Sequence, residues 1–454
     1  MEDVQVNQIV EEHRAWAFDE SNRGPKSRIQ ALNALERALV SHKDLLLEAL
    51  AADLGKPAME SYSSELSLII HEIRYARKRI RRWMARRRTG VINRGIILRE
   101  PFGAALVIGP WNYPVQLTLS PLVSALAAGN GVTVKPSELA PNTAAAIRSM
   151  LVEAFEPKVV RVVLGDAETA KTLLDAGFDK VFFTGSPQVG SLVAARAARC
   201  HSDVTLELGG KSPVVVTADS NIDFAARRIV WGKFLNAGQT CVAPDYALVH
   251  ESVQQNFLDA LKRSIVDFFG ENPKSSPDFG RIINDKHFDR ISGLIDRAST
   301  VFGGRTDKDR LFIEPTILSA DMNSSAMKEE IFGPVLPVIS WASFGDVKRV
   351  ISVNPNPLAV YCFSRDKNFL KRIVTEIPFG GGAMNDTILH LSNPRLPFGG
   401  RGGSGIGNYH GRWGFEAFTH VKGIKAARQG KASSMRFPPY KPMPERMRRM
   451  LFGI

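Results

Sequence analysis

Apolar residues recur every three or four positions through residues 1–88, which predicts that this part of the chain is mostly helical. The run from Arg28 to Leu39 has this spacing. A second helical face is formed by Ile69, Ile73, Ala76, Ile80 and Trp83. Residues 91–100 are expected to form a short hairpin or an extended arm.

From residue 101 the pattern changes to short apolar or β-branched runs that alternate with segments able to form helices. The runs are Ala104–Ile108, Gly131–Val134, Val159–Leu164, Lys180–Phe183 and Val204–Leu208. The intervening segments are 117–129, 141–155, 167–176 and 189–199. This alternation predicts a parallel sheet covered by helices, with right-handed crossovers.

A second alternating unit begins at Ser212 and is separated from the first by Gly209 and Gly210, which we expect to act as a hinge. Its predicted helices are 223–235, 252–269 and 284–298, and its predicted strands are 212–216, 311–318, 334–340 and 358–363. The fold class is therefore α/β, with two doubly wound, Rossmann-like parallel-sheet domains. Beyond Pro394 the chain is glycine-rich, and it ends in a basic, proline-rich tail.

The number and spacing of the cysteines indicate the redox setting of the protein. The 454 residues include three cysteines, Cys200, Cys241 and Cys362, and no CxxC pair. The pattern supports neither a disulfide framework nor a zinc site, so we predict no metal and a reducing, cytoplasmic setting. There is no secretory apolar stretch at the N-terminus and no apolar run long enough to be a transmembrane segment.

The formal net charge is +13, and nine of the basic residues lie between Arg74 and Arg88. A second basic patch is Arg446, Arg448 and Arg449. Such patches can bind nucleic acid or an anionic membrane surface. Because helical apolar spacing runs through the first cluster, a solvated helix face is the favoured interpretation. We therefore expect no nucleic-acid partner, while weak contact with a membrane surface stays open.

A glycine turn follows the predicted strand Lys180–Phe183. Gly185, Ser186 and Gly190 precede and open a helix, an arrangement that leaves backbone N–H groups free to bind a phosphate. A plain strand-to-helix turn is equally compatible. The formal GxGxxG at Gly400–Gly405 follows no strand and is interpreted as a loop near the active site.

A second candidate cofactor site is the segment after the strand Gly131–Val134. Lys135 and Glu138 there could hydrogen-bond ribose hydroxyls, and an acidic Glu138 would favour NAD over NADP by repelling a 2′-phosphate. The alternative is an exposed turn in which Ser137 caps the next helix.

Cys241 ends a small, polar, glycine-containing segment with no partner cysteine nearby, which makes it a candidate nucleophile. Four segments in order around it resemble the aldehyde dehydrogenase family: 110–114, 206–213, 234–241 and 329–335. The stretches Ala237–Tyr246 and Asn408–Gly411 are similar to its class 3 branch, which contains fatty and aromatic aldehyde enzymes. The resemblance covers nearly the whole chain.

The resemblance implies NAD(P)-dependent oxidation of an aldehyde to a carboxylic acid. In it, Cys241 corresponds to the nucleophile, Glu207 to the general base and Asn112 to an oxyanion donor. Glu330 matches a residue that holds the nicotinamide ribose, and Phe332 one that packs on that end of the cofactor.

The resemblance also implies how the chain divides into domains. Residues 1–207 would form the cofactor-binding domain, interrupted by an oligomerisation arm at about 89–102. Residues 208–395 would form the catalytic domain, and 396–454 an active-site loop, an oligomerisation segment and the tail. A homodimer is expected.

Two alternatives stay open at this point. A CoA-acylating aldehyde dehydrogenase would pass the acyl group to CoA rather than to water, although Glu207 argues against it. The other is a protein of a different class that binds anionic surfaces through residues 74–88. The sequence does not reveal which aldehyde is the substrate.

Overall fold

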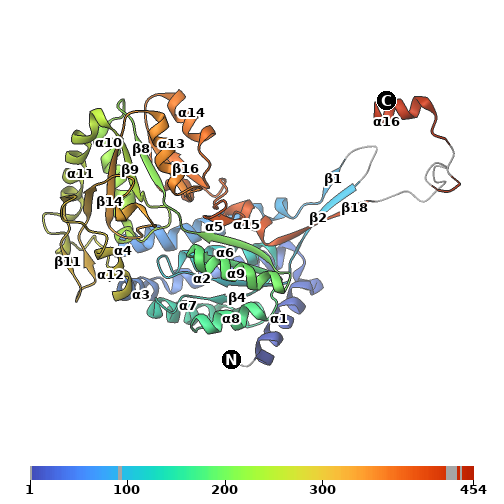
Figure 1. Cartoon of the computed structure of the whole chain (residues 1–454). Helices are drawn as coiled ribbons and strands as arrows, with labels where there is room; N and C mark the ends of the chain where they lie inside the picture. Colours follow the sequence, from blue (N-terminus) through green and yellow to red (C-terminus); the bar gives the residue numbers. More distant parts are fainter. Residues whose placement is uncertain (1–2, 90–94, 426–436, 440–441, 454) are drawn as a thin grey trace. The chain divides into compact units, whose positions relative to one another are not determined.

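The computed structural model describes residues 3–89, 95–425, 437–439 and 442–453 (Figure 1). It divides into two compact units. The first comprises Met1–Met84 and Glu100–His420, and the second comprises Ala85–Arg99 and Val421–Ile454. Both sheets of the predicted α/β fold lie in the first unit, so the residues of the candidate site belong to one body.

The N-terminal part is helical, as predicted. Its helices are α1 (Asp3–Phe18), α2 (Pro25–Ser41), α3 (Lys43–Leu54), α4 (Ala58–Ser61) and α5 (Ser67–Trp83). A single π-helical turn, Tyr62–Leu66, joins α4 to α5. The five apolar positions predicted to form one face of α5 are all buried. On its opposite side Arg74 and Arg77 pair with Glu36 of α2, which agrees with a solvated helix face.

The first sheet has the strand order β17-β7-β6-β3-β4-β5. Its strands are β3 (Ala104–Ile108), β4 (Gly131–Lys135), β5 (Val160–Val162), β6 (Lys180–Gly185), β7 (Asp203–Leu208) and β17 (Gly405–Ile406). All neighbours are parallel except β17, which runs antiparallel to β7. Because β4 lies on one side of β3 and β6 on the other, the strand order reverses at β3.

Helices cover both faces of this sheet, so its strands are apolar on both sides rather than alternating. The connecting helices are α6 (Gln116–Ala128), α7 (Pro141–Ala154), α8 (Ala167–Asp175) and α9 (Pro187–Arg199). Along β3, Ala105 and Val107 face the core that contains α2, α5, α6 and α7. The alternate residues Ala104, Leu106 and Ile108 face the core that contains α1, α8 and α9.

The second sheet has the order β10-β13-β14-β9-β8-β15-β16. Its strands are β8 (Pro213–Val216), β9 (Tyr246–His250), β10 (Thr300–Phe302), β13 (Thr316–Ser319), β14 (Val335–Trp341), β15 (Ala359–Phe363) and β16 (Gly381–Met384). The helices α10 (Ile222–Phe234) and α11 (Gln254–Phe269) pack on one face. The helices α13 (Phe344–Val353) and α14 (Lys367–Glu376) pack on the other (Figure 1).

Three expectations for this region need correction. The predicted strand 311–318 is two strands in different sheets, because β12 (Phe312–Ile313) pairs with β11 (Thr306–Asp307) and β13 joins the main sheet. The predicted helix 284–298 ends early, since α12 covers Asp285–Ser292. The central strand β9 was not predicted, because a short apolar run beside a loop carries no period of its own.

The second unit contains most of a three-stranded sheet of order β1-β2-β18. Its strands are β1 (Arg87–Thr89), β2 (Gly95–Pro101) and β18 (Thr419–Lys425), of which β1 and β2 are antiparallel. Part of the predicted arm, residues 90–94, lies outside the described residues. The tail forms a helix that was not predicted, α16 (Glu445–Phe452), and α15 (Gly411–Ala417) precedes β18. Within the described ranges, no helix combines the length and apolarity needed to cross a bilayer.

Candidate active site

The predicted cofactor residues lie at the carboxyl ends of adjacent strands of the first sheet. Lys135 ends β4, Gly185 ends β6, and Asn112 lies four residues beyond the end of β3. The strand order reverses between β3 and β6, and a crevice outside such a switch point is where open parallel sheets bind their ligands. Ser186 is the N-cap of α9, which thus begins at this edge of the sheet.

Packing explains why the third residue of the predicted turn, Gly190, is a glycine. A Cβ on Gly190 would come within 2.5 Å of Leu208, so a glycine here lets α9 pack closely on β7. At the end of β4, the ammonium of buried Lys135 donates to the exposed Glu138 carboxylate at 3.0 Å. Both residues therefore lie at the carboxyl end of β4, where a ribose-binding pair is expected.

Cys241 follows a tight turn, Leu235–Thr240, which has an unusual backbone. Asn236 and Ala237 are left-handed, with φ of 53° and 51°, and Gly238 has φ of 76°. A Cβ on Gly238 would collide with the carbonyl of Gly333, so no other residue fits this position. The buried Gln239 amide donates to the carbonyls of Asn236 and Arg281 at 3.0 and 2.9 Å.

The turn is cross-linked by hydrogen bonds to Asn112 and its neighbour Tyr113. The Asn112 amide donates to the Gln239 carbonyl at 3.0 Å, and the Asn236 amide donates to the Asn112 carbonyl at 2.7 Å. The Tyr113 hydroxyl lies 2.8 Å from the Thr240 hydroxyl. An amide NH₂ has two N–H groups, so Asn112 keeps one for another acceptor.

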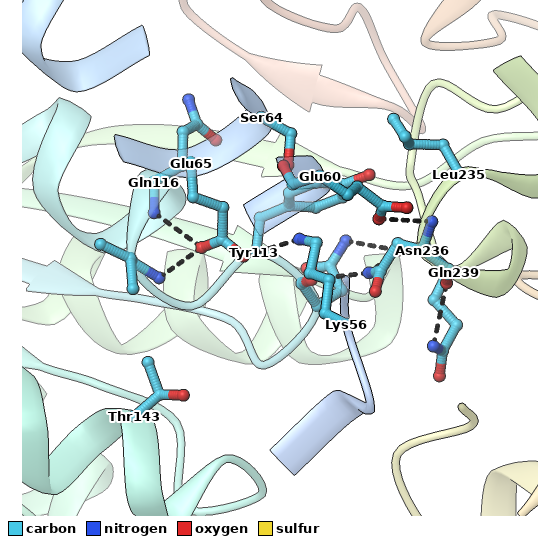
Figure 2. A network of polar contacts seen from close by, with 12 residues as sticks. Lys56, Glu60, Ser64, Glu65, Tyr113, Gln116, Thr143, Leu235, Asn236 and Gln239 are labelled. Atoms are coloured by element: carbon cyan, nitrogen blue, oxygen red, sulfur yellow. Dashed lines mark hydrogen bonds and ion pairs between the residues drawn. The ribbon is translucent and has the colours of Figure 1, made fainter. Parts of the chain in front are cut away.

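A buried ion pair fixes the segment that follows Asn112. The Lys56 ammonium donates to Glu65 at 2.6 Å, and both side chains are fully buried. The other Glu65 oxygen accepts the backbone N–H groups of Val115 and Gln116 at 2.8 and 3.2 Å. Lys56 also lies 3.7 Å from the centre of the Tyr113 ring (Figure 2). The segment that carries Asn112 is thereby fixed on both sides.

Three acidic groups gather at the candidate site. Burial raises the pKa of the half-buried Cys241 thiol, and the carboxylates of Glu330 and Glu207 raise it further. Burial also raises the pKa of the Glu207 carboxyl well above its ordinary value. Glu207 is only 3% exposed, and neither of its carboxyl oxygens has a hydrogen-bond partner among the described residues.

Glu207 is positioned by the first sheet. It lies in β7, opposite Thr184 of β6 and Gly405 of β17. The loop that contains the formal GxGxxG therefore lies beside Glu207, as predicted, and Ser404 accepts the Leu208 N–H at 3.1 Å. The carboxyl group thus lies on a rigid strand, but its oxygens are free to bind a water molecule or substrate.

Glu330 and Phe332 lie next to the segments that follow β7 and β3. The Glu330 carboxylate contacts Gly209, where any side chain would collide with it. Burial raises the pKa of Glu330 to about 8, and nearby Asp245 contributes to the rise. Phe332, with a left-handed φ of 49°, packs edge-on against Trp111 at a ring distance of 5.4 Å.

Several residues of this site were not predicted. Lys56, Glu60, Glu65 and Tyr113 act through partners remote in sequence, so no local pattern marks them. Lys233 is fully buried in α10, its ammonium has no partner among the described residues, and burial lowers its pKa to about 8. Tyr113 alone had a signal, since it follows Asn112 in a segment already singled out.

The residues present fit a dinucleotide. The N-terminus of α9 lies at this edge of the first sheet, where Pro187 has no N–H and the Val189 N–H donates to Ser186. The Thr184 hydroxyl at the end of β6 is buried without a partner among the described residues, and the unpartnered oxygens of Glu207 lie on the adjacent strand. Within the described ranges, no group of three or more His, Cys, Asp or Glu side chains could hold a metal ion.

Comparisons with known proteins agree with this geometry. A model of the aldehyde dehydrogenase family matches residues 1–424. The chain is 43% identical to the 4,4'-diaponeurosporen-aldehyde dehydrogenase of Staphylococcus aureus, covering 96% of this chain and 97% of that protein. It is 42% identical to a rat aldehyde dehydrogenase described as dimeric and NADP-preferring, covering 96% and 98%.

Solved structures give the same result. The substrate-bound state of Staphylococcus aureus AldH matches with a TM-score of 0.93 and 42% identity, covering 97% of each chain. A Mycobacterium tuberculosis aldehyde dehydrogenase complexed with NAD⁺ matches with a TM-score of 0.85 and 29% identity, covering 95% and 92%.

The buried, unpartnered Glu207 leads to a prediction about stability. Since the folded state favours its protonated form, the contribution to stability is complete below the ordinary pKa of about 4.5 and is lost as pH rises through the raised value. We expect Glu207→Gln to match the wild type at acidic pH and to exceed it in alkaline buffer. The gain should be about 1–3 kcal/mol, the usual cost of an unsatisfied buried group.

Thermal unfolding midpoints measured from acidic to alkaline pH would check this. Glu48→Gln, an exposed glutamate of α3, is the matched control and should follow the wild type throughout. Parallel curves for wild type and Glu207→Gln would contradict the expected burial effect.

Proposed function

This chain belongs to the aldehyde dehydrogenase family, and we propose that Cys241, Glu207 and Asn112 carry out its NAD(P)-dependent aldehyde oxidation. The observation that carries the proposal is the cluster itself. The thiol lies within electrostatic reach of Glu207, and Asn112 is hydrogen-bonded to the turn that precedes the thiol. Glu207 has two oxygens without partners, which suits a group that must bind water.

The steps follow from the side chains. Cys241 gives its proton to a water molecule, and its sulfur attacks the aldehyde carbon, giving a thiohemiacetal whose oxygen carries the negative charge. The free N–H of Asn112 and the backbone N–H of Cys241 stabilise that oxygen, a contribution of roughly 3–4 kcal/mol per donor. When bound, the nicotinamide ring accepts the hydride. Glu207 then takes a proton from water, which attacks the thioester and releases the carboxylic acid and the thiol.

The cofactor residues are proposed on the same basis. Gly185 and Ser186 would bind the phosphates, and Lys135 with Glu138 would bind the adenosine ribose. Gly190 would not contact them, because its N–H donates to the Ser186 carbonyl and its α-carbon packs on Leu208. Glu330 and Phe332 would hold the nicotinamide end. The family uses NAD or NADP. A preference of this chain for NAD stays a prediction from Glu138, and the free cysteines favour a reducing, cytoplasmic location.

We expect Cys241→Ala to abolish aldehyde-dependent formation of reduced nicotinamide. Glu207→Gln should give about one equivalent per active site and then stall, with steady-state turnover lowered roughly 10²–10⁴-fold, because oxidation does not need the base whereas hydrolysis does. Absorbance of reduced nicotinamide in rapid mixing measures both.

Cys200→Ser is the matched control, since this second free cysteine ends α9 away from the turn, and it should retain full turnover. Turnover by Cys241→Ala would refute the thiol mechanism. A CoA-dependent rate with an acyl-CoA product would instead support the CoA-acylating alternative.

A pocket of about 590 Å³ lies beside the Leu235–Thr240 turn, and we propose that it receives the aldehyde's carbon chain. Its wall is largely apolar and includes Trp231, Phe234 and Leu235. The charged side chains that line it are all acidic: Glu60, Asp267 and Asp278. Uncharged apolar aldehydes, of medium chain length or aromatic, are the substrates that such a wall favours.

We expect a straight-chain aldehyde to have a kcat/KM at least tenfold higher than a chain of equal length that ends in a carboxylate, a difference of about 1.4 kcal/mol. The reason is repulsion by the acidic wall. Steady-state kinetics with paired substrates measures the ratio, and Asp278→Asn should narrow it. Equal kcat/KM values for the two substrates would count against this pocket as the binding site.

We also propose that the chain forms a homodimer through the small sheet of the second unit. β18 is an edge strand, and Val421 and Ile424 on it are 52% and 44% exposed. Apolar side chains on an open edge favour pairing with another copy.

Light scattering should therefore give twice the 50.0 kDa mass of the chain. The double variant Val421→Asp and Ile424→Asp should give the mass of one chain. Val40→Asp, at an equally exposed valine of α2, should stay dimeric. A wild type of single-chain mass would overturn the dimer.

A further inference from the structure

Glu60 is a half-buried carboxylate that connects two features of the molecule. It belongs to α4 and lines the apolar pocket described above. Its Oε1 atom also accepts the backbone N–H of Asn236 at 2.8 Å, across 176 residues of sequence (Figure 2). One side chain is thus shared by the pocket wall and by the turn that leads to Cys241.

The N–H group that Glu60 accepts belongs to the first left-handed residue of the turn. Asn236 has φ of 53° and ψ of 37°, a conformation that a residue other than glycine adopts only where its surroundings hold it. From there its side-chain amide donates to the carbonyls of Asn112 and Gln239 at 2.7 and 3.2 Å. The Glu60 bond therefore continues, through Asn236, to the proposed oxyanion donor.

The charges around Glu60 do not provide a substitute for this contact. The nearby ammonium of Lys56 is bonded to Glu65, and the Ser64 hydroxyl bonds the Glu60 backbone carbonyl rather than its carboxylate. The other groups that face it, Glu65 and Asp278, are acidic. Among the described residues, the Asn236 N–H is the hydrogen-bond partner of this carboxylate.

We propose that Glu60 is a positioning residue, whose carboxylate holds Asn236 in its left-handed conformation and thereby fixes Asn112 and Cys241 beside the aldehyde pocket. The proposal rests on the assignment of Cys241 as nucleophile. Glu60 touches neither the thiol nor a reacting atom. Its effect reaches the chemistry through the turn.

The hydrogen bond depends on pH. Burial raises the pKa of Glu60 to about 7; Glu65 and Asp278 add to the rise, while Lys56 and the bond to Asn236 oppose it. A carboxylate accepts an N–H more strongly than a carboxylic acid does. As pH rises through about 7 the turn is held more firmly, and as pH falls it loosens.

Two variants separate the acceptor from its charge. Glu60→Gln keeps an oxygen that can accept the Asn236 N–H but removes the titration, whereas Glu60→Ala removes the acceptor. With an uncharged aldehyde, we expect Glu60→Ala to lower kcat about tenfold with little change in KM, the equivalent of one lost hydrogen bond. Glu60→Gln should retain most of kcat at low pH and lack the rise that wild type shows near pH 7. Glu48→Gln should match wild type.

A second measurement is independent of aldehyde turnover. The rate at which iodoacetamide alkylates Cys241, read from its peptide by mass spectrometry, should change near pH 7 in the wild type. This change in alkylation rate should be absent from Glu60→Gln. Thermal unfolding midpoints of the variants would verify that they are folded. Identical alkylation and kcat profiles for wild type and Glu60→Gln would overturn the proposal.

The two measurements also separate failure of this proposal from failure of the proposed function. Turnover by Cys241→Ala would remove the function assigned to the thiol, whatever Glu60 does. An inactive Cys241→Ala together with unchanged Glu60 variants would leave the function intact and remove only the role of Glu60. If Glu60→Ala fails to fold, the pH profiles of Glu60→Gln decide.

Discussion

The site depends on the hydrogen bonds between Asn112 and the Leu235–Thr240 turn. These bonds join the end of β3 in the first sheet to the turn that precedes β9 in the second. Without them Asn236 would lose part of what keeps it left-handed, and Cys241 would lose its fixed position relative to Asn112. The two sheets therefore contribute to one site. Buried side-chain amides need hydrogen-bond partners, and those of Asn112 and Asn236 find them on the segment that belongs to the other sheet.

Burial then sets the protonation of the reacting groups. Cys241, Glu207 and Glu330 all have a raised pKa, with desolvation as the largest cause in each, and the two carboxylates raise that of the thiol. Three acids in one crevice cannot all ionise cheaply. A positively charged nicotinamide ring bound beside these groups would offset that cost. Glu207, whose oxygens have no hydrogen-bond donor among the described residues, favours its protonated form more than an exposed carboxyl does.

Much of the architecture could be predicted from the sequence, because both sheets are covered on both faces and their strands read as apolar runs between helical segments. The predictions that were wrong concern the ends of individual strands and helices. The run 311–318 was divided by a change of sheet, and the helix after Asp285 stopped at Ser292 although apolar spacing continued. The candidate site was found through Cys241, Glu207 and Asn112, which stand in recognisable segments. Lys56 and Glu65 had no such signal, since their partners are set by the fold alone.

The same reasoning explains why Gly238 and Asn236 differ in kind. At Gly238 the constraint is steric, because only glycine fits against the Gly333 carbonyl. At Asn236 the side chain tolerates the left-handed region, and the fold must supply what holds it there. That holding force comes from its own amide, which binds Asn112, and from a carboxylate in the pocket wall, which binds its N–H. The position of the thiol therefore depends both on the proposed oxyanion donor Asn112 and on a carboxylate in the wall of the proposed substrate pocket.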